Sequence, residues 1–226
     1  MIGSNFQKNN LDFKEKLASL DFFLIFLVML VGVISFFTMY SSEQGQIGYY
    51  TKSHFLRFVT FFFVFLVISF LRTRFWFKSA YLFYILVAIL LISVDLFGIT
   101  ASGSKRWINL YFINLQPSEL MKIAIVIFLA RYYYKIPTEN VTNIKYIFTP
   151  IFALFIPVFL VATQPDLGTA VLILITGVSV IWLTGFRLKF FLYSSILFIF
   201  LLPVGISFLK PYQKLRILTF FDPDKD

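Results

Sequence analysis

Phe22-Phe-Leu-Ile-Phe-Leu-Val-Met-Leu-Val-Gly-Val-Ile-Ser-Phe-Phe-Thr-Met-Tyr40 carries no charged side chain along its whole length. A helix of about 20 apolar residues is long enough to cross the hydrocarbon core of a bilayer. Backbone amides inside lipid find no solvent partner, so a spanning segment satisfies them within a helix. This stretch therefore predicts a transmembrane helix.

Further apolar stretches of similar length follow along the chain. They are Phe55–Leu71, Ala80–Phe97, Leu120–Tyr134, Ile147–Thr163, Thr169–Phe186 and Phe190–Leu209. None alternates apolar and polar residues as a membrane strand does. The sequence thus predicts an all-α polytopic membrane protein with about seven transmembrane helices.

The composition supports lipid as the main solvent. Hydrophobic residues make up 59% of the 226 residues and charged residues only 14%, against about 45–50% and 25% in soluble domains. With no cysteine and one histidine, the chain offers neither a disulfide nor a multi-histidine metal site. Its net charge of +9 indicates cytoplasmic loops and anionic headgroups rather than nucleic acid.

Lys and Arg set the expected direction of the helices. The polar segment 1–20 is interpreted as a cytoplasmic tail ending in a short helix, and each predicted inner loop then has a basic cluster beside a span. Outer basic residues concentrate in Ser104–Lys122 and Lys210–Lys225. Glu43 and His54 fall in the first outer loop and are expected to be solvated.

The first outer basic segment contains Arg106 and Trp107, and continues through Gln116-Pro-Ser-Glu-Leu-Met-Lys122. Pro117 suits the first turn of the next helix, and Glu119 and Lys122 share one helical face. One interpretation is a mutual salt bridge with interfacial Trp and Arg anchors. The other is a cationic cradle in which Arg106 and Lys122 bind the phosphate of a lipid headgroup.

Two other segments have similar alternatives. Thr163-Gln-Pro-Asp-Leu-Gly-Thr169 is a tight outer turn in which Asp166 caps the following helix; either it is purely structural or Gln164 and Asp166 face a cavity. The stretch from Lys210 to Arg216 is either a basic helix lying on headgroups or an extension of the same anion-binding surface.

Taken together, these segments resemble the RodA/FtsW (SEDS) family, and their sequences are closer to RodA than to FtsW. The matching residues are Lys105-Arg106-Trp107-Ile108, Gln116-Pro117-Ser118-Glu119-Leu120, Lys122, Leu129-Ala130-Arg131-Tyr132, Gln164-Pro165-Asp166-Leu167-Gly168-Thr169, Tyr212-Gln213, Arg216 and Asp222-Pro223. Gln-Pro-Ser-Glu followed by Gln-Pro-Asp-Leu-Gly-Thr, both at outer span ends, is the most specific part.

The resemblance implies a ten-helix bundle, of which segment 21–226 is a SEDS-type transmembrane domain truncated in the large outer loop after the seventh span. It implies a peptidoglycan glycosyltransferase that polymerises lipid II during cell elongation and shape maintenance. The family's catalytic aspartate is expected beyond Asp226, so this chain alone is expected to be inactive. Residues implied in substrate binding are Arg106, Trp107, Gln116, Glu119, Lys122, Gln164, Asp166, Lys210 and Arg216.

The resemblance also implies the setting of the protein. We expect a multi-pass protein of the bacterial inner membrane whose active face is extracytoplasmic. Its expected partners are lipid II, membrane lipid and a class B penicillin-binding protein acting as transpeptidase, with no nucleic acid. No cofactor is required by the sequence, although a divalent cation is compatible with the chemistry.

Two residues depart from the family pattern. Asn109 stands where the family usually has Asp, and Asn114 where it usually has Arg, so one expected outer positive charge is missing. Two other functions remain open at this point: a lipid II transporter, or a noncatalytic membrane scaffold for a transpeptidase. A transporter would need polar groups near the midplane, whereas here they gather at the outer ends of the spans.

Overall fold

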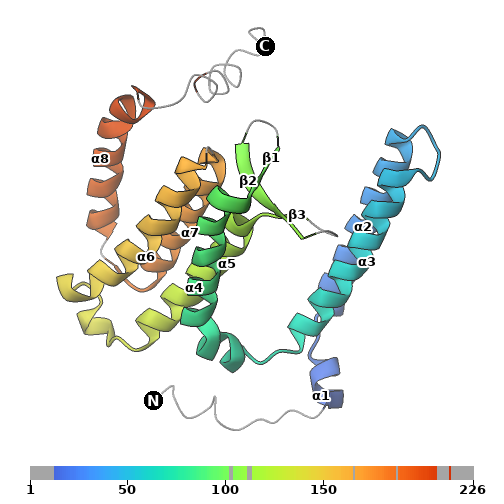
Figure 1. Ribbon diagram of the computed structural model, residues 1–226. Coiled ribbons are helices and arrows are strands. Elements are labelled where there is room, and N and C mark those ends of the chain that lie inside the picture. The colour runs from blue at the N-terminus through green and yellow to red at the C-terminus, as the bar shows by residue number, and fades with distance from the viewer. Residues whose placement is uncertain are drawn as a thin grey trace. The chain divides into compact units, whose positions relative to one another are not determined.

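The computed structural model describes residues 13–101, 104–110, 114–164, 166–186, 188–207 and 214. Seven long helices occupy the predicted positions and confirm the polytopic helical fold (Figure 1). Their bounds are α2 Phe22–Ser42, α3 Tyr49–Ser69, α4 Thr73–Phe97, α5 Pro117–Tyr134, α6 Ile144–Thr163, α7 Leu167–Leu183 and α8 Leu188–Ser207. A short helix, α1 (Phe13–Ala18), precedes them, and a 3₁₀ turn (Thr138–Asn140) separates α5 from α6.

Within the described residues, four helices are long and apolar enough to cross a membrane: α2, α3, α4 and the Lys145–Thr163 part of α6. Of the other three long helices, two are less typical for identifiable reasons. Helix α5 includes Glu119, Lys122 and Arg131, and α7 has only 17 residues. Helices with charges at their ends or with fewer residues still fit a membrane when neighbouring helices cover their polar groups. The chain is therefore a multi-pass membrane protein.

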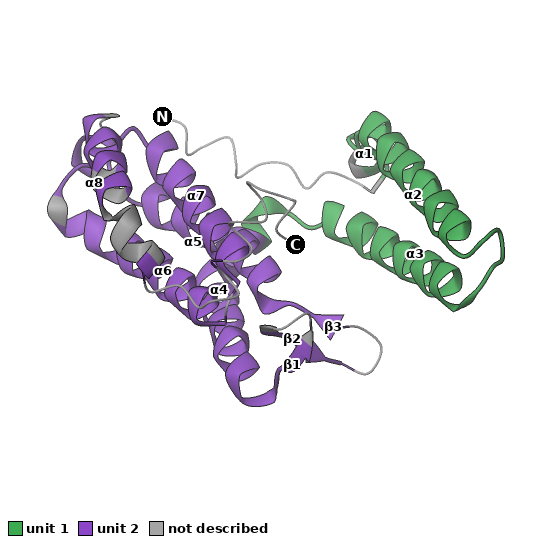
Figure 2. Ribbon diagram, turned by 90° about the horizontal axis from the view of Figure 1, so that it is seen from above, with its two compact units in different colours: residues 1–75 green, residues 76–226 purple. Residues whose placement is uncertain are grey.

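Two compact units divide the chain, residues 1–75 and 76–226 (Figure 2). In the first unit, α2 and α3 form a helical hairpin. A Cβ added at Gly32 of α2 would lie 2.1 Å from Cζ of Phe58, so glycine is what lets the phenyl ring of α3 approach. Ser35 Oγ and His54 Nε2 are 2.7 Å apart across the same interface. His54 is thus half-buried within α3 and has a side-chain partner, whereas the sequence placed it in a loop.

Glu43, which was expected to be solvated, is half-buried and also has partners within the chain. Its carboxylate accepts a hydrogen bond from the Thr51 hydroxyl and others from the backbone N–H groups of Gly48, Tyr50 and Thr51, at 3.1, 3.0 and 2.9 Å. These are the N–H groups that the start of α3 leaves without helical partners. The hydrogen bond from Thr51 and the backbone bonds lower the pKa of Glu43, because they favour its charged form.

The core of the second unit is built by α4 to α7. Its buried residues recur at spacings of three and four, which places them on one face of each helix. They include Tyr84, Val87 and Leu91 on α4, Met121, Ile125 and Leu129 on α5, Leu154 and Val161 on α6, and Ala170, Ile173 and Ile181 on α7. Tyr84 Oη donates to the Ala153 carbonyl at 2.7 Å, which satisfies a polar group inside the bundle.

A small antiparallel sheet, which the sequence analysis did not predict, lies between α4 and α5. Its strands are β1 Ile99–Ala101, β2 Ser104–Asn109 and β3 Asn114–Leu115, in the order β1-β2-β3. Ile99 pairs with Trp107, and Asn109 pairs with Asn114. Pairing gives the polar backbone of the connection its hydrogen bonds near the membrane edge.

Candidate functional site

The candidate site lies at the end of the second unit where α5 and α7 begin. Figure 1 shows the three strands at this same end of the helices. Strand β2 packs against α5, and α5 against α7. Two neighbouring stretches, β2 and the start of α5, therefore meet the connection between α6 and α7, which lies far from them in sequence.

Strand β2 sends two neighbouring cations to different partners. The Lys105 ammonium donates to the backbone carbonyls of Asp95 and Leu96 at 2.6 and 3.5 Å, where α4 ends with unsatisfied carbonyls. Arg106 Nη1 lies 3.5 Å from Oδ1 of Asp166. Successive side chains of a strand point to opposite faces, so fixing Lys105 on α4 directs Arg106 towards the α6–α7 connection.

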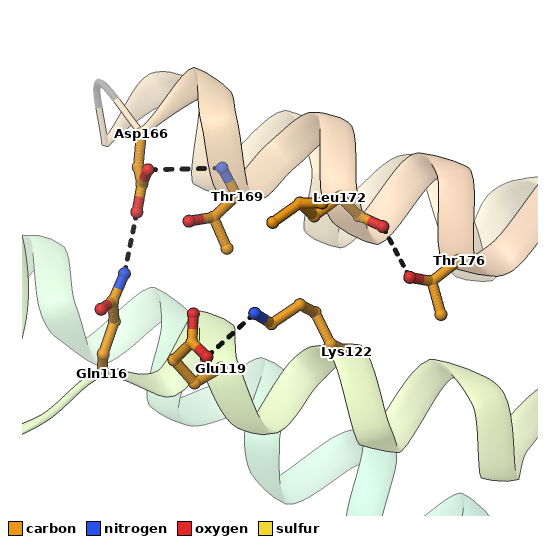
Figure 3. Close-up of polar contacts among 7 residues, drawn as sticks. All are labelled: Gln116, Glu119, Lys122, Asp166, Thr169, Leu172 and Thr176. Carbon is orange, nitrogen blue, oxygen red and sulfur yellow. Dashed lines mark hydrogen bonds and ion pairs between the residues drawn. The ribbon is translucent and has the colours of Figure 1, made fainter. Parts of the chain in front are cut away.

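Asp166 joins three elements. It is the N-cap of α7, and its Oδ1 accepts from the Thr169 N–H at 3.4 Å, which confirms the predicted cap. Its Oδ2 accepts a 2.8 Å hydrogen bond from Nε2 of Gln116 (Figure 3). Gln116 is the N-cap residue of α5 but does not cap that helix with its own side chain. One buried carboxylate thus links the starts of α5 and α7 with β2.

Glu119 and Lys122 form the second ion pair of the site. Lys122 Nζ lies 2.9 Å from Glu119 Oε2, with side-chain exposures of 27% for the lysine and 55% for the glutamate. Figure 3 shows both side chains on the side of α5 that carries Gln116, towards α7. The salt bridge expected from their spacing is present. Arg106 and Asp166 are 23% and 9% exposed, so the two pairs differ in the exposure of the carboxylate and hardly in that of the cation.

The other predicted site residues have different surroundings. The side-chain amide of Gln164 donates to the Leu91 carbonyl at 2.7 Å and is buried, so this residue ties α6 to α4. Trp107 is half-buried in β2 opposite Ile99. Lys210 and Arg216 lie outside the described residues. In the part of the chain that the structure describes, no cluster of His, Asp and Glu has the three or more members that could hold a metal ion.

Arg106 has a buried donor to spare. Its Nε is buried and has no hydrogen-bond partner among the described residues. A guanidinium carries five N–H donors in a fixed planar arrangement that matches phosphate oxygens. Together with Lys122, this gives the site two cations, both held by carboxylates, at the positive ends of two helix dipoles.

The two departures from the family pattern are partners. Asn109 and Asn114 lie directly opposite each other in the β2–β3 ladder. The Asp and Arg that the family usually has there would face each other as a cross-strand ion pair. Replacing both with asparagine removes one negative and one positive charge, so the expected loss of outer positive charge is cancelled.

Comparisons with known proteins identify the family to which the sequence is similar. Residues 18–226 match the FtsW/RodA/SpoVE family, described as cell cycle proteins. The chain is 34% identical over 194 residues to the probable peptidoglycan glycosyltransferase FtsW of Buchnera aphidicola subsp. Schizaphis graminum, covering 84% of this chain and 55% of that protein. It is 35% identical over 147 residues to the peptidoglycan glycosyltransferase MrdB of Escherichia coli K12, covering 63% of this chain and 38% of that protein.

Solved structures share the fold. A chain from a peptidoglycan synthase complex, described as coordinating polymerization and crosslinking, superposes with a TM-score of 0.78 and 26% identity over 91% of this chain and 60% of that chain. The rod shape determining protein RodA of Thermus thermophilus superposes with a TM-score of 0.69 and 23% identity over 81% of this chain and 60% of that one. The chain spans about half the length of the relatives that it matches.

Proposed function

The chain belongs to the FtsW/RodA/SpoVE family, and from this premise we propose that it forms part of a peptidoglycan glycosyltransferase that polymerises lipid II. The observation that carries the proposal is the presence of two cations at this end of the bundle: Arg106 pairs with Asp166 at the start of α7, and Lys122 pairs with Glu119 near the start of α5. A lipid-linked pyrophosphate has the charge and the membrane depth that fit this place. The relatives named above are peptidoglycan glycosyltransferases.

In the proposed reaction, the 4-hydroxyl of one N-acetylglucosamine attacks the anomeric carbon of another lipid II molecule. The carbon–oxygen bond to undecaprenyl pyrophosphate breaks, a β-1,4 bond forms with inversion, and the hydroxyl proton passes to a general base. Negative charge builds up on the leaving pyrophosphate, so positioned cations stabilise the transition state. We assign that role to Lys122 and Arg106.

Lys122 is suited to exchange partners. Exposed ion pairs contribute only about 0–1 kcal/mol, and Lys122 and Glu119 are both accessible. A phosphate can therefore replace Glu119 beside Lys122 at low cost. The N-terminus of α5, with Pro117 in its first turn, adds a favourable dipole for the same anion.

The general base lies, in this proposal, in the segment that the family resemblance places after Asp226. The chain then supplies binding of the leaving group but not activation of the hydroxyl. Positioned base catalysis contributes about 10²- to 10⁴-fold, so residues 1–226 alone should bind the lipid without polymerising it. We place the site on the outer face of the bacterial plasma membrane.

A transpeptidase partner and a role in cell elongation belong to the same proposal. One matched structure is of a complex that coordinates polymerization with crosslinking, which supports a class B penicillin-binding protein as the partner. The similarity of the sequence motifs to those of RodA favours a role in elongation and shape maintenance over one in division.

The test is formation of glycan strands from purified lipid II in liposomes by the full-length protein. Lys122→Ala should lower the rate by about 100-fold, as the loss of one stabilising group does elsewhere, whereas Lys52→Ala, a lysine in the first turn of α3, should leave it unchanged. Unchanged rates for both Lys122→Ala and Arg106→Ala would overturn the proposal. Lipid II movement between leaflets without strand formation would favour a transporter.

A single-cysteine labelling experiment tests the orientation, since the chain has no cysteine of its own. An impermeant thiol reagent added outside should label a cysteine at Gln46, between α2 and α3, but not one at Thr138, between α5 and α6. The reverse pattern would place the site on the wrong face of the membrane for this reaction.

A further inference from the structure

Resting on the proposed function, we propose that Asp166 is a positioning residue: it orients Arg106 for an anionic lipid pyrophosphate and does not itself contact the substrate. Sequence reasoning placed Asp166 among the substrate-binding residues. The contacts of the carboxylate assign it to a different task.

Both oxygens of Asp166 are already in use. Oδ1 accepts from the Thr169 N–H at 3.4 Å and faces Arg106 Nη1 at 3.5 Å, while Oδ2 accepts from Gln116 at 2.8 Å. A carboxylate has acceptors only, so it repels phosphate. With its side chain 9% exposed, Asp166 is poorly placed to meet a substrate hydroxyl either.

Arg106, by contrast, has unused binding capacity and needs to be held. Its buried Nε has no acceptor among the described residues, although a buried donor normally has one. A free arginine side chain carries about 2 kcal/mol of rotamer entropy. Holding the guanidinium before the ligand arrives removes part of that cost from binding.

The neighbouring elements fix the position of the Asp166 carboxylate, and through it the position of Arg106. The carboxylate is fixed by the first turn of α7 and by the residue that begins α5, while Lys105 anchors the same strand on α4. Arg106 is thereby held between elements whose own positions are set by the helical core.

A competing interpretation predicts the opposite sign. If Asp166 were only an anion near the site, removing its charge would strengthen phosphate binding, because one source of repulsion disappears. If it positions Arg106, removing its charge weakens binding. Asp166→Asn separates the two cases. The amide oxygen of the new asparagine still caps α7, and the side-chain amide of Gln116 can rotate so that its oxygen accepts from the asparagine NH2 group.

The first experiment measures undecaprenyl pyrophosphate binding to residues 1–226 in nanodiscs of neutral lipid, for wild type, Asp166→Asn, Arg106→Ala and the double variant. Asp166→Asn should weaken binding by roughly tenfold, a change of about 1.4 kcal/mol. The double variant should bind no more weakly than Arg106→Ala alone, because a residue acting through another is not additive with it. Glu43→Gln, a capping carboxylate of α3, serves as the control. Should Arg106→Ala prove poorly folded, Arg106→Met keeps the aliphatic stem and takes its place.

Tighter binding by Asp166→Asn, or fully additive losses, would refute the positioning role. A second measurement keeps this result separate from the proposed function. In ¹⁵N-arginine spectra, Nε–H of Arg106, identified by its loss in Arg106→Ala, should exchange slowly in wild type and rapidly in Asp166→Asn. Unchanged exchange refutes positioning even where binding is weaker. Changed exchange in a chain that binds no pyrophosphate would support positioning and overturn only the pyrophosphate site.

Discussion

Replacing Arg106 with alanine should destabilise the chain more than replacing Lys122 with alanine, although both substitutions remove one cation from an ion pair. Asp166, left behind by Arg106→Ala, has a side chain only 9% exposed, whereas Glu119, left behind by Lys122→Ala, is 55% exposed. Water can solvate the second carboxylate but has little access to the first. The difference in burial therefore decides the difference in stability.

The magnitudes follow from the two geometries. Removing one partner of a fully buried pair costs about 3–5 kcal/mol. The Arg106–Asp166 separation is a long 3.5 Å, and Asp166 keeps its hydrogen bonds from Gln116 and Thr169. We therefore expect a smaller loss of about 2 kcal/mol for Arg106→Ala, on the scale of a hydrogen-bonded charge. An exposed pair such as Lys122–Glu119 contributes about 0–1 kcal/mol.

Thermal unfolding of the purified chain in detergent, followed by tryptophan fluorescence, measures both. For a chain of this size, 1 kcal/mol shifts Tm by about 2–4 °C, so Arg106→Ala should lower Tm by about 4–8 °C and Lys122→Ala by no more than about 4 °C. Arg106→Met combined with Asp166→Asn should recover part of the loss, because no unpaired buried charge remains. Equal shifts for the two alanine variants would show that burial does not distinguish the pairs.

Three further predictions concern other parts of the chain. The pKa of Glu43 is lowered in the folded chain, so its cap on α3 is fully present above the ordinary carboxyl pKa and is lost as pH falls through the lower folded value. Hydrogen exchange in the first turn of α3 should therefore accelerate over that acidic range. Glu43→Gln should abolish this dependence of the exchange rate on pH. Gly177→Ala should destabilise the chain by about 1–3 kcal/mol, because the added Cβ would clash with Cδ1 of buried Leu154. Gly168→Ala should not destabilise it, because nothing lies within 4 Å of a Cβ at that position. The Tm values of the two variants measure the difference. Asn114→Arg alone should leave stability nearly unchanged, while adding Asn109→Asp opposite it should stabilise the sheet by about 0.2–1 kcal/mol, measured by a double-mutant cycle of Tm values.

The seven helices could be predicted from the sequence because lipid imposes a single requirement on each. An apolar stretch of spanning length has to satisfy its own backbone, so helix is the outcome whatever the neighbours are. Only the ends moved: α3 begins at Tyr49 rather than Phe55, and α4 at Thr73 rather than Ala80. Polar first turns such as Thr73-Arg74 extend a helix beyond its apolar stretch, and hydropathy does not detect them.

The small sheet was not predicted from the sequence. Ile99-Thr-Ala and Ser104–Asn109 are short runs, and a β-branched and aromatic pattern around the turn dipeptide Ser102-Gly103 was their only signal. The same pattern would have allowed two strands to be predicted in this connection. Pairing then places Asn109 opposite Asn114, a relation that single-residue comparison with a family pattern cannot show.

The candidate site was predictable residue by residue but not contact by contact. The Glu119–Lys122 pair and the Asp166 cap follow from spacings of three residues, which local geometry fixes. The hydrogen bond from Gln116 to Asp166 and the one from Gln164 to Leu91 join residues 50 and 73 positions apart. Such contacts depend on how the helices pack, and for that the sequence alone offers no local rule.

The two ion pairs together suggest why a membrane-edge site uses two kinds of cation. A charge near the hydrocarbon core is tolerated only when paired or in contact with water, so each cation needs a carboxylate while the site is empty. The Arg106 pair is the more buried, and its carboxylate is fixed by two helices, so exchanging it for a ligand is costly and its direction is kept. Glu119, the partner of Lys122, is exposed, so a phosphate can replace it at little cost. Under the proposed function, an arriving pyrophosphate would meet one cation that sets its orientation and one that adapts to its charge, and both would stabilise the negative charge that grows on the leaving group.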